Sequence, residues 1–273
     1  AWAAHVQSQS SEELFGALPQ PEILMTHDVD AIHKTLPIRL KQGAFNLFNS
    51  VRHLMKGEFA ASIKKIGTAT RFLLGNEDWW TFDLLLEMEK SAGVNAQFNF
   101  YADARKKSFK SWLFDPCYNI DSQKTRELFT KIREQNGVIG LHPTFDSWNS
   151  SELIAKQRAH LSVASNQAIT SCRQHWLRFG WTDTWDKQSQ AGMKEDTTLM
   201  FNERSGFRAA AALAWSPWSQ EKKSTGNIRE LPSVMMDSHF FDYQAMSESE
   251  RRTSIHNWLA EVKTSFSKIE LPR

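Results

Sequence analysis

The chain has 273 residues, enough for one large α/β domain with a sizeable hydrophobic core. Its formal net charge of +2 is close to neutral, so the overall charge does not indicate a nucleic-acid-binding protein. The sequence shows no apolar run long enough to cross a membrane and no secretory signal peptide. The two cysteines, Cys117 and Cys172, make no disulfide framework and fit a reducing compartment or simple burial, and the expected location is cytoplasmic.

The first elements expected along the chain are an extension, a strand and a helical insertion. Residues 1–20 are polar at first and predict a loosely packed extension, and an apolar run predicts a strand over about 21–27. Residues 31–76 then carry apolar side chains at helical spacing, which predicts one or two amphipathic helices. This insertion is basic, with Glu58 as its only acid. Its basic face could contact a membrane surface or an anionic glycan, although such faces are more often only solvated.

Strands and helices alternate over the rest of the chain. We expect helices over 79–92, 121–136, 150–166, 182–191 and 247–266, and strands over 94–100, 138–141, 169–177, 194–198, 209–214 and 229–236. Strands that alternate with helices imply a mainly parallel sheet. Six or seven such units suggest a barrel, with polar residues gathered at the carboxyl ends of the strands. No repeat or linker is visible, so one domain over 21–273 is the simplest count.

Two aspartates stand at the end of the first expected strand, in Thr26-His27-Asp28-Val29-Asp30. Residues two apart in a strand point to the same side, so Asp28 and Asp30 would face one space, roughly 7 Å apart at Cα. Two carboxylates in one pocket repel each other unless a cation lies between them. A divalent metal bound by one aspartate, with the other free as a base, explains this arrangement. The alternative is a strand end with solvated acids, or a helix N-cap.

Three further strand ends carry groups that could meet in the same space. They are His142 and Asp146 after the third full strand, Arg173, His175 and Arg178 in the fourth, and Asp196 in the fifth. A carboxylate and an imidazole from different strands suit a zinc-like cation with open positions. Taken alone, His142 could be a hydrogen-bonded structural histidine, and Asp146 could cap the next helix. Several of the eleven tryptophans lie near these motifs, where aromatic rings could stack on sugars or simply pack.

Four motifs in this order resemble the polysaccharide deacetylase superfamily, also called NodB-like or carbohydrate esterase family 4. They are Thr-His-Asp-Val-Asp, Gly-Leu-His-Pro-Thr, Arg-Gln-His-Trp-Leu-Arg and Gly-Met-Lys-Glu-Asp-Thr-Thr-Leu. The similarity spans about residues 21–237 and is nearest to the surface-polysaccharide deacetylase-like branch. It implies a distorted (β/α)7 barrel that uses a divalent metal, most simply zinc, to remove N-acetyl groups from a sugar or polysaccharide precursor in bacterial surface-polysaccharide biosynthesis.

The resemblance also implies roles for single residues. Asp28 matches the catalytic base, and Arg173 matches the arginine that braces it. Asp30 matches the metal-binding acid, and His142 matches the first metal histidine. Asp196 matches an acid of the later motif that supports the site.

The chain departs from the family pattern at three places. Asp146 stands where the family has a second metal histidine, and we expect it to be the third metal ligand. His175 stands where proline is usual, and it is either an extra ligand or the catalytic acid. The strand that carries the acid histidine of the family would begin near Ile269, where the chain stops. Either that last strand is missing, or His175 or His239 replaces the acid, or the domain does not turn over.

The leading interpretation is therefore a metal-dependent carbohydrate N-deacetylase, which the intact aspartates and Arg173 favour. The alternative is a catalytically inactive carbohydrate-binding domain on the same fold, which the substituted ligand and the missing acid favour. A purely structural α/β domain would not explain the coincidence of four strand ends. The expected partner is an N-acetylated sugar or polysaccharide, and the candidate contacts to it are Trp176, Arg178 and Arg208.

Overall fold

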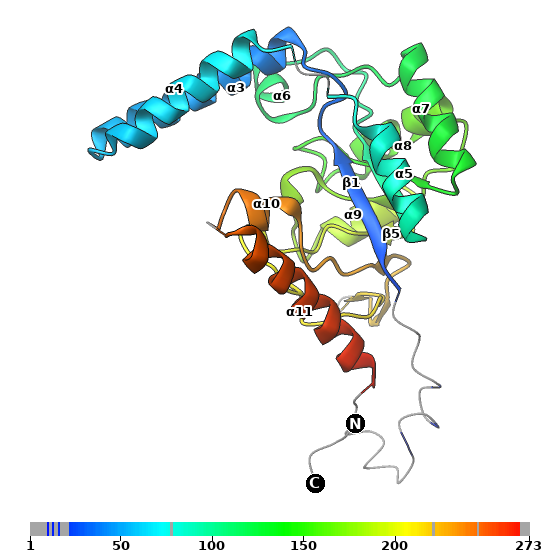
Figure 1. Cartoon of the computed structure of the whole chain (residues 1–273). Coiled ribbons are helices and arrows are strands. Elements are labelled where there is room, and N and C mark those ends of the chain that lie inside the picture. Colours follow the sequence, from blue (N-terminus) through cyan, green and yellow to red (C-terminus); the bar gives the residue numbers. More distant parts are fainter. Residues whose placement is uncertain are drawn as a thin grey trace. The chain divides into compact units, whose positions relative to one another are not determined.

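The computed structural model describes residues 22–76, 79–219, 222–244 and 246–267, together with residues 10, 13 and 16. Contacts divide the chain into two compact units (Figure 1). The sheet unit comprises Met25–Thr198 and Trp215–Glu230, and the second unit comprises Ala1–Leu24, Leu199–Ala214 and Leu231–Arg273. Most of the predicted extension over 1–20, the residue Asp78 and the chain end from Ile269 lie outside the described residues. The single domain expected from the sequence stays a prediction.

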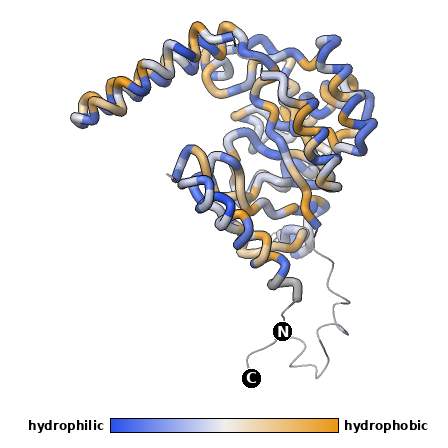
Figure 2. The backbone as a smooth tube through the Cα atoms, viewed as in Figure 1, coloured by the Kyte–Doolittle hydropathy of each residue, from blue (hydrophilic) through white to orange (hydrophobic). Residues whose placement is uncertain are grey.

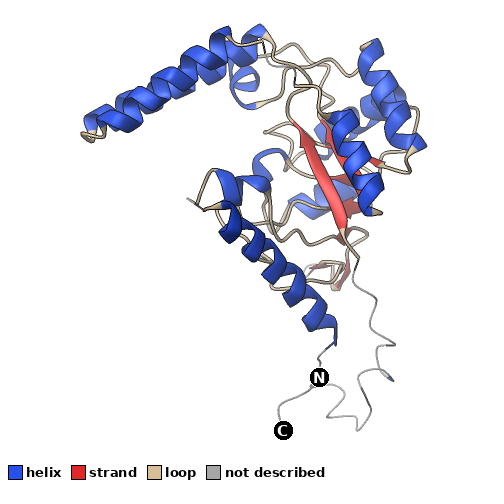
Figure 3. Ribbon diagram, in the orientation of Figure 1, coloured by secondary structure: helices blue, strands red, loops and turns tan. Residues whose placement is uncertain are grey.

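Six strands of the sheet unit form one sheet in the order β1-β2-β3-β4-β5-β8. Figure 3 shows the strands in red and the helices in blue. They are β1 (Leu24–Val29), β2 (Asn95–Phe100), β3 (Val138–Leu141), β4 (Ser171–Cys172), β5 (Glu195–Asp196) and β8 (Arg229–Glu230). The pairs from β2 onward are parallel. The strands follow chain order without the reversal of a doubly wound sheet, so the sheet is a curled half-barrel. This confirms the α/β class and the barrel-like winding that the sequence predicts.

Helices connect these strands. The sheet unit contains α3 (Leu36–Met55), α4 (Phe59–Leu74), α5 (Phe82–Ala92), α6 (Phe109–Phe114), α7 (Gln123–Glu134), α8 (Ser151–Ser165), the short 3₁₀ helix η1 (His175–Leu177) and α9 (Thr184–Gln190). The second unit contains α10 (Asp237–Phe241) and α11 (Glu248–Ser267). In the sheet unit, the strands β6 (Trp218–Ser219) and β7 (Ser224–Thr225) form a separate antiparallel pair outside the main sheet. The insertion after the first strand is thus confirmed as two helices, whereas α6 and α10 are not predicted. None of the described helices is long and apolar enough to span a membrane.

Strand β2 shows how the sheet separates its hydrophobic core from its polar side. Phe98 and Phe100 are fully buried, and the ring of Phe100 meets Phe129 of α7 edge to face, with centroids 4.9 Å apart. Gln97 and Asn99 are equally buried, but they point to the opposite side of the strand because side chains alternate. Parallel sheets cover both faces, so this buried polar side lies inside the curl of the sheet, where a site can form.

The fourth strand is shorter than the predicted 169–177. Strand β4 covers only Ser171–Cys172, and beyond it the chain turns at Trp176 and Leu177, which take φ values of 59° and 49°. These left-handed values turn the chain and end the extended conformation. The turn leaves His175 and Trp176 in η1, directly beyond the end of the strand.

Two of the later strands also differ from the prediction. Residues 209–214 form no strand, because Ala210 has a φ of 52° and its N–H bonds to the Phe207 carbonyl in a turn. The strand expected over 229–236 ends at Glu230, two residues before Pro232, which cannot donate to a strand ladder.

Candidate metal centre

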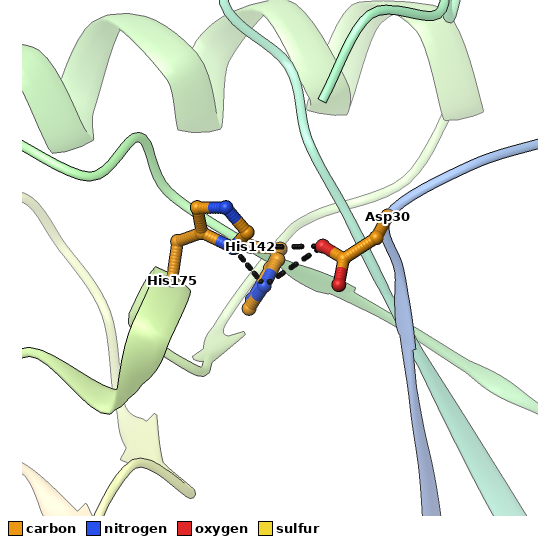
Figure 4. A group of neighbouring side chains, drawn as sticks. All are labelled: Asp30, His142 and His175. Atoms are coloured by element: carbon orange, nitrogen blue, oxygen red, sulfur yellow. Dashed lines mark hydrogen bonds and ion pairs between the residues drawn. The ribbon is translucent and has the colours of Figure 1, made fainter. Parts of the chain in front are cut away.

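Three strand ends place potential metal ligands around one point (Figure 4). Asp30 follows β1, His142 follows β3, and His175 follows β4. The Oδ1 atom of Asp30 lies 3.5 Å from both His142 Nε2 and His175 Nδ1, and those two nitrogens lie 2.8 Å apart. Both histidines are buried, whereas the side chain of Asp30 is 63% exposed. The cluster is therefore fixed on the protein side and open to solvent on the other.

On each histidine, the ring nitrogen that points away from the cluster fixes the tautomer. His142 Nδ1 lies 2.7 Å from the carbonyl oxygen of Arg173, and His175 Nε2 lies 2.7 Å from the carbonyl oxygen of Phe114. A carbonyl only accepts, so an N–H donates at each of these positions, and a neutral imidazole has no second N–H. His142 Nε2 and His175 Nδ1 then face each other as lone pairs, which repel unless a proton or a cation lies between them. Metal-binding histidines use their far nitrogen in this way.

The donor set and its spacing fit a divalent metal. Two imidazole nitrogens and one carboxylate oxygen are the protein ligands of many catalytic zinc sites, which keep a fourth position open. Tetrahedral zinc with ordinary bond lengths would hold its ligand atoms about 3.3 Å apart. The two separations to Asp30 are close to this value, and the two nitrogens, at 2.8 Å, need only a small opening. Of the two roles left open for His175, this geometry supports the ligand.

The two histidines differ in their affinity for a proton. Burial, together with the positive charge of His142, lowers the pKa of His175 to about 4. Burial also opposes a charge on His142, but the carboxylates of Asp28 and Asp30 outweigh burial and raise its pKa above the ordinary value. A proton on the pair therefore resides on His142, and a metal ion must displace it.

Asp28 lies beside this cluster and is held as a carboxylate. Its Oδ1 atom accepts a hydrogen bond from Asn99 Nδ2 at 2.8 Å and lies 3.4 Å from an Arg173 guanidinium nitrogen. Burial by itself raises the pKa of Asp28, but the positive charges of Arg173 and His142 and the bond from Asn99 outweigh burial and lower it. Arg173 is fixed in turn by a bond from its Nε to the carbonyl of Thr197. An ionised carboxylate next to a metal position can act as a general base.

Two buried residues of β2 support Asp28, and the sequence prediction misses both. Gln97 Nε2 donates to Asn99 Oδ1 at 2.7 Å, and Asn99 donates to Asp28. The signal is present in the sequence, because polar residues alternate with apolar ones in this strand and must share one face. Gly140 of β3 makes room for them, since a Cβ at that position would lie 2.2 Å from Asn99 Oδ1.

Gly140→Ala is expected to displace the Asn99 amide and so loosen Asp28. We expect a loss of about 1–3 kcal/mol in the free energy of unfolding, as is usual for overpacking, measured by urea denaturation. The matched control is Gly67→Ala in α4, where a Cβ meets nothing within 4 Å and helix propensity favours alanine. Equal stability of Gly140→Ala and Gly67→Ala would contradict this role for Gly140.

Asp146, which the sequence predicts as the third ligand, is not brought to the cluster. Its carboxylate lies 2.7 Å from Lys110 Nζ and 3.1 Å from a guanidinium nitrogen of Arg178. The cause is a turn in which the N–H of Ser147 bonds to the carbonyl of Thr144 and the chain leaves the end of β3. His175 occupies the third place instead.

Asp196 supports the segment before His175 and makes no contact in the metal cluster. It is fully buried, and it accepts hydrogen bonds from Gln188 Nε2 at 2.9 Å and from the hydroxyl of Thr198. The same hydroxyl accepts from the backbone N–H of Gln174 at 3.0 Å. Burial raises the pKa of Asp196. These bonds fix the chain next to His175, as expected of an acid that supports the site.

The three predicted substrate contacts differ in their surroundings. Trp176 follows His175 and is 57% exposed, and its indole N–H donates to the Phe114 carbonyl at 3.2 Å. The guanidinium of Arg178 lies 4.0 Å above the Phe145 ring and also bonds to Asp146, so it braces the loop after β3. Arg208 belongs to the second unit, and its role stays a prediction.

His239, a candidate for the catalytic acid, also lies in the second unit and uses both ring nitrogens there. Its Nδ1 accepts from the Met236 N–H at 3.2 Å, so its Nε2 donates to the Phe201 carbonyl at 3.0 Å. It is fully buried. A structural role accounts for all of these contacts.

Comparison with known proteins gives matches among solved structures alone. Neither a protein-family model nor a curated protein matches the sequence. A protein from Mycobacterium smegmatis that is assigned as a polysaccharide deacetylase shows 14% identity and a TM-score of 0.47, with 92% of this chain and 78% of that chain covered. IcaB from Ammonifex degensii shows 14% identity and a TM-score of 0.34, with 66% and 85% covered. BA3943 from Bacillus anthracis, a CE4 family pseudoenzyme, shows 17% identity and a TM-score of 0.27, with 40% and 34% covered.

These similarities are low, so the proposals below depend on the side chains of this chain itself. Of these three solved structures, one is described as a polysaccharide deacetylase and one as a CE4 family pseudoenzyme.

Proposed function

We propose that the protein is a metal-dependent hydrolase that removes N-acetyl groups from a sugar or polysaccharide precursor, with a role in surface-polysaccharide biosynthesis. The observation that carries this proposal is the close approach of His142 Nε2 and His175 Nδ1, which lie 2.8 Å apart beside Asp30. Such a pair suits a divalent cation, most simply zinc. The ionised Asp28 lies next to it, where a hydrolase needs a base.

The residues of the chain divide the chemistry between them. A bound ion would supply a water of lowered pKa and would polarise the acetamide carbonyl. Asp28 accepts the proton of the attacking water, and Arg173 and Asn99 keep its carboxylate ionised and oriented. As a ligand, His175 would bind the ion through Nδ1, while its Nε2 donates to the Phe114 carbonyl. It therefore has no free nitrogen with which to protonate the leaving amine. Asp28, once protonated, is then the group that returns a proton to the amine nitrogen.

Trp176 is the residue that we expect to hold the sugar. Its exposed indole lies directly beside the ligand His175 and is fixed by its bond to the Phe114 carbonyl. Trp176→Ala is expected to raise KM about two- to tenfold with a smaller effect on kcat, as is typical for the loss of one stacking contact. Trp218→Ala is the matched control, because Trp218 is exposed to the same degree but lies in β6. If Trp176→Ala changes KM no more than Trp218→Ala does, Trp176 is not the residue on which the sugar stacks.

The proposal is tested by measuring acetate release from N-acetylated oligosaccharides. The full chain is assayed as purified, after chelation, and after addition of one equivalent of zinc. We expect activity that chelation abolishes and zinc restores. Binding of the oligosaccharide, followed by tryptophan fluorescence, without release of acetate at full metal occupancy would instead identify an inactive carbohydrate-binding domain.

A further inference from the structure

The helical hairpin formed by α3 and α4 has small and polar side chains inside. Ser50 Oγ lies 2.8 Å from Ser62 Oγ, and a Cβ added at Gly43 would lie 2.7 Å from Leu73, so the two helices run antiparallel in close contact. Gly43, Ser50 and Ser62 are all buried. Small residues and hydroxyl bonds between helices are typical of helix pairs in apolar surroundings.

The apolar side chains of the hairpin face outward. Six of them, exposed by 46–70%, are Leu40, Leu47, Val51, Leu54, Ile63 and Ile66. Successive residues of an α-helix are rotated by about 100°. On each helix, these exposed residues therefore form a stripe that lies roughly a quarter turn from the side packed against the other helix. Viewed from the N-terminus of each helix, the stripe is rotated from the packed side in the same direction. Because the helices are antiparallel, these equal rotations place both stripes on one common face. We call this face the apolar face, and Figure 2 shows apolar residues along both helices.

Among the described residues of the sheet unit, none covers the apolar face. Within the sheet unit, α3 and α4 pack mainly against each other, and they extend together away from α5, α7 and α8 (Figure 1). The base of the hairpin is fixed by Arg39, whose guanidinium donates to the carbonyls of Leu73 and Gly75 at 2.8 and 2.6 Å. Exposed apolar surface of this extent usually marks an interaction site.

The charge of the hairpin indicates which partner covers this face. Residues 31–76 contain eight lysines and arginines and a single acid, Glu58, which is paired with His53 at 2.5 Å. Exposed basic residues such as Lys64 and Arg71 flank the stripe on α4. A second copy of the hairpin would bring like charges together, and a soluble anionic glycan would leave the leucines and isoleucines in water. An anionic lipid surface satisfies both properties at once.

We propose that the α3–α4 hairpin is a membrane-docking element, which lays its apolar face into the headgroup region of an anionic bilayer while its lysines and arginines contact the lipid phosphates. Neither helix meets the requirements for crossing a membrane, so the hairpin lies in the interface. The first helix begins six residues after Asp30, so docking would hold the metal cluster close to the membrane surface. The inference is independent of the proposed reaction.

Vesicle co-sedimentation of the full chain tests this proposal. We expect binding to vesicles that contain phosphatidylglycerol, little binding to pure phosphatidylcholine, and weaker binding at high salt. The double variant Leu47→Glu/Ile63→Glu is expected to lower the affinity at least about tenfold, because each glutamate removes an inserted side chain and adds a repelled charge. The double variant Lys64→Gln/Arg71→Gln is expected to lower the affinity for these vesicles and to make binding less dependent on salt.

The matched control is Val163→Glu in α8, because Val163 is an apolar residue outside the hairpin that is 80% exposed, more than Leu47 or Ile63. It should bind vesicles like the wild type, and all variants should keep the wild-type unfolding temperature, since the changed residues are exposed. Failure to bind phosphatidylglycerol vesicles would overturn the proposal, as would equal binding by Leu47→Glu/Ile63→Glu. A dimer in solution that the same double variant dissociates would show instead that a second copy covers the apolar face.

Discussion

His142→Ala is expected to abolish stoichiometric metal binding and, with it, acetate release. The residue supplies one of three donor atoms, and its removal leaves one imidazole and one exposed carboxylate. Loss of a group that merely orients a ligand costs about 10- to 100-fold in metal affinity, so loss of the ligand itself should cost at least about 100-fold. Elemental analysis after dialysis measures the ion content per chain, and a competition titration with a zinc chelator measures the affinity.

His142 is fully buried, so its loss also leaves a cavity, and the fold must be checked separately. His142→Gln keeps most of the volume and should lose the ion as well, while thermal unfolding shows that the chain is folded. His256→Ala is the matched histidine control, because His256 is exposed in α11. If His142→Gln and His256→Ala keep the same ion content as the wild type, the ion is bound elsewhere and the cluster of Asp30, His142 and His175 is not the metal site.

Asp28→Asn separates the base from the metal ligands. The amide keeps the size of the carboxylate, and its oxygen can still accept from Asn99, but it cannot take a proton from water. Removal of a general base lowers rates by about 10²- to 10⁴-fold, so we expect a loss of kcat in that range with the ion content unchanged. Initial rates of acetate release and elemental analysis on the same preparation give both values.

Asp186→Asn is the control for this substitution. Asp186 forms a surface ion pair with Lys222 at 2.7 Å, and such pairs contribute little to stability. It should keep both kcat and the ion. If Asp28→Asn loses the ion together with its activity, Asp28 is a ligand rather than the base, and the assignment of roles to Asp28 and Asp30 has to be exchanged.

The sequence predicts the frame of the site because strand alternation and strand ends are local properties. Asp28 and Asp30 stand at the end of β1 and both face His142, which follows β3 directly. The parallel order of the strands then brings these ends to one edge of the sheet. The motif resemblance contributed the assignment of base and ligand, which alternation alone cannot distinguish.

The third residue of the cluster could not be predicted from strand alternation and strand ends. Asp146 stands at the expected sequence position, but a turn after β3 directs it to Lys110 and Arg178. His175 reaches the site because the chain after β4 leaves the strand conformation at Trp176, whose left-handed φ no local propensity predicts. The role of Asn99 is not predictable for a different reason. Its polar position in β2 is evident from the sequence, but its bond to Asp28 joins residues 71 positions apart and depends on the room that Gly140 leaves.

The most direct test of the metal centre is an anomalous difference map, recorded at the zinc absorption edge from crystals of the zinc-loaded full chain. The geometry predicts one peak between Asp30, His142 Nε2 and His175 Nδ1, about 2.0–2.2 Å from each donor atom. It also predicts that the two nitrogens move apart from their present 2.8 Å. A peak at other residues, or none at this position in fully loaded protein, would contradict the metal site and the hydrolase built on it.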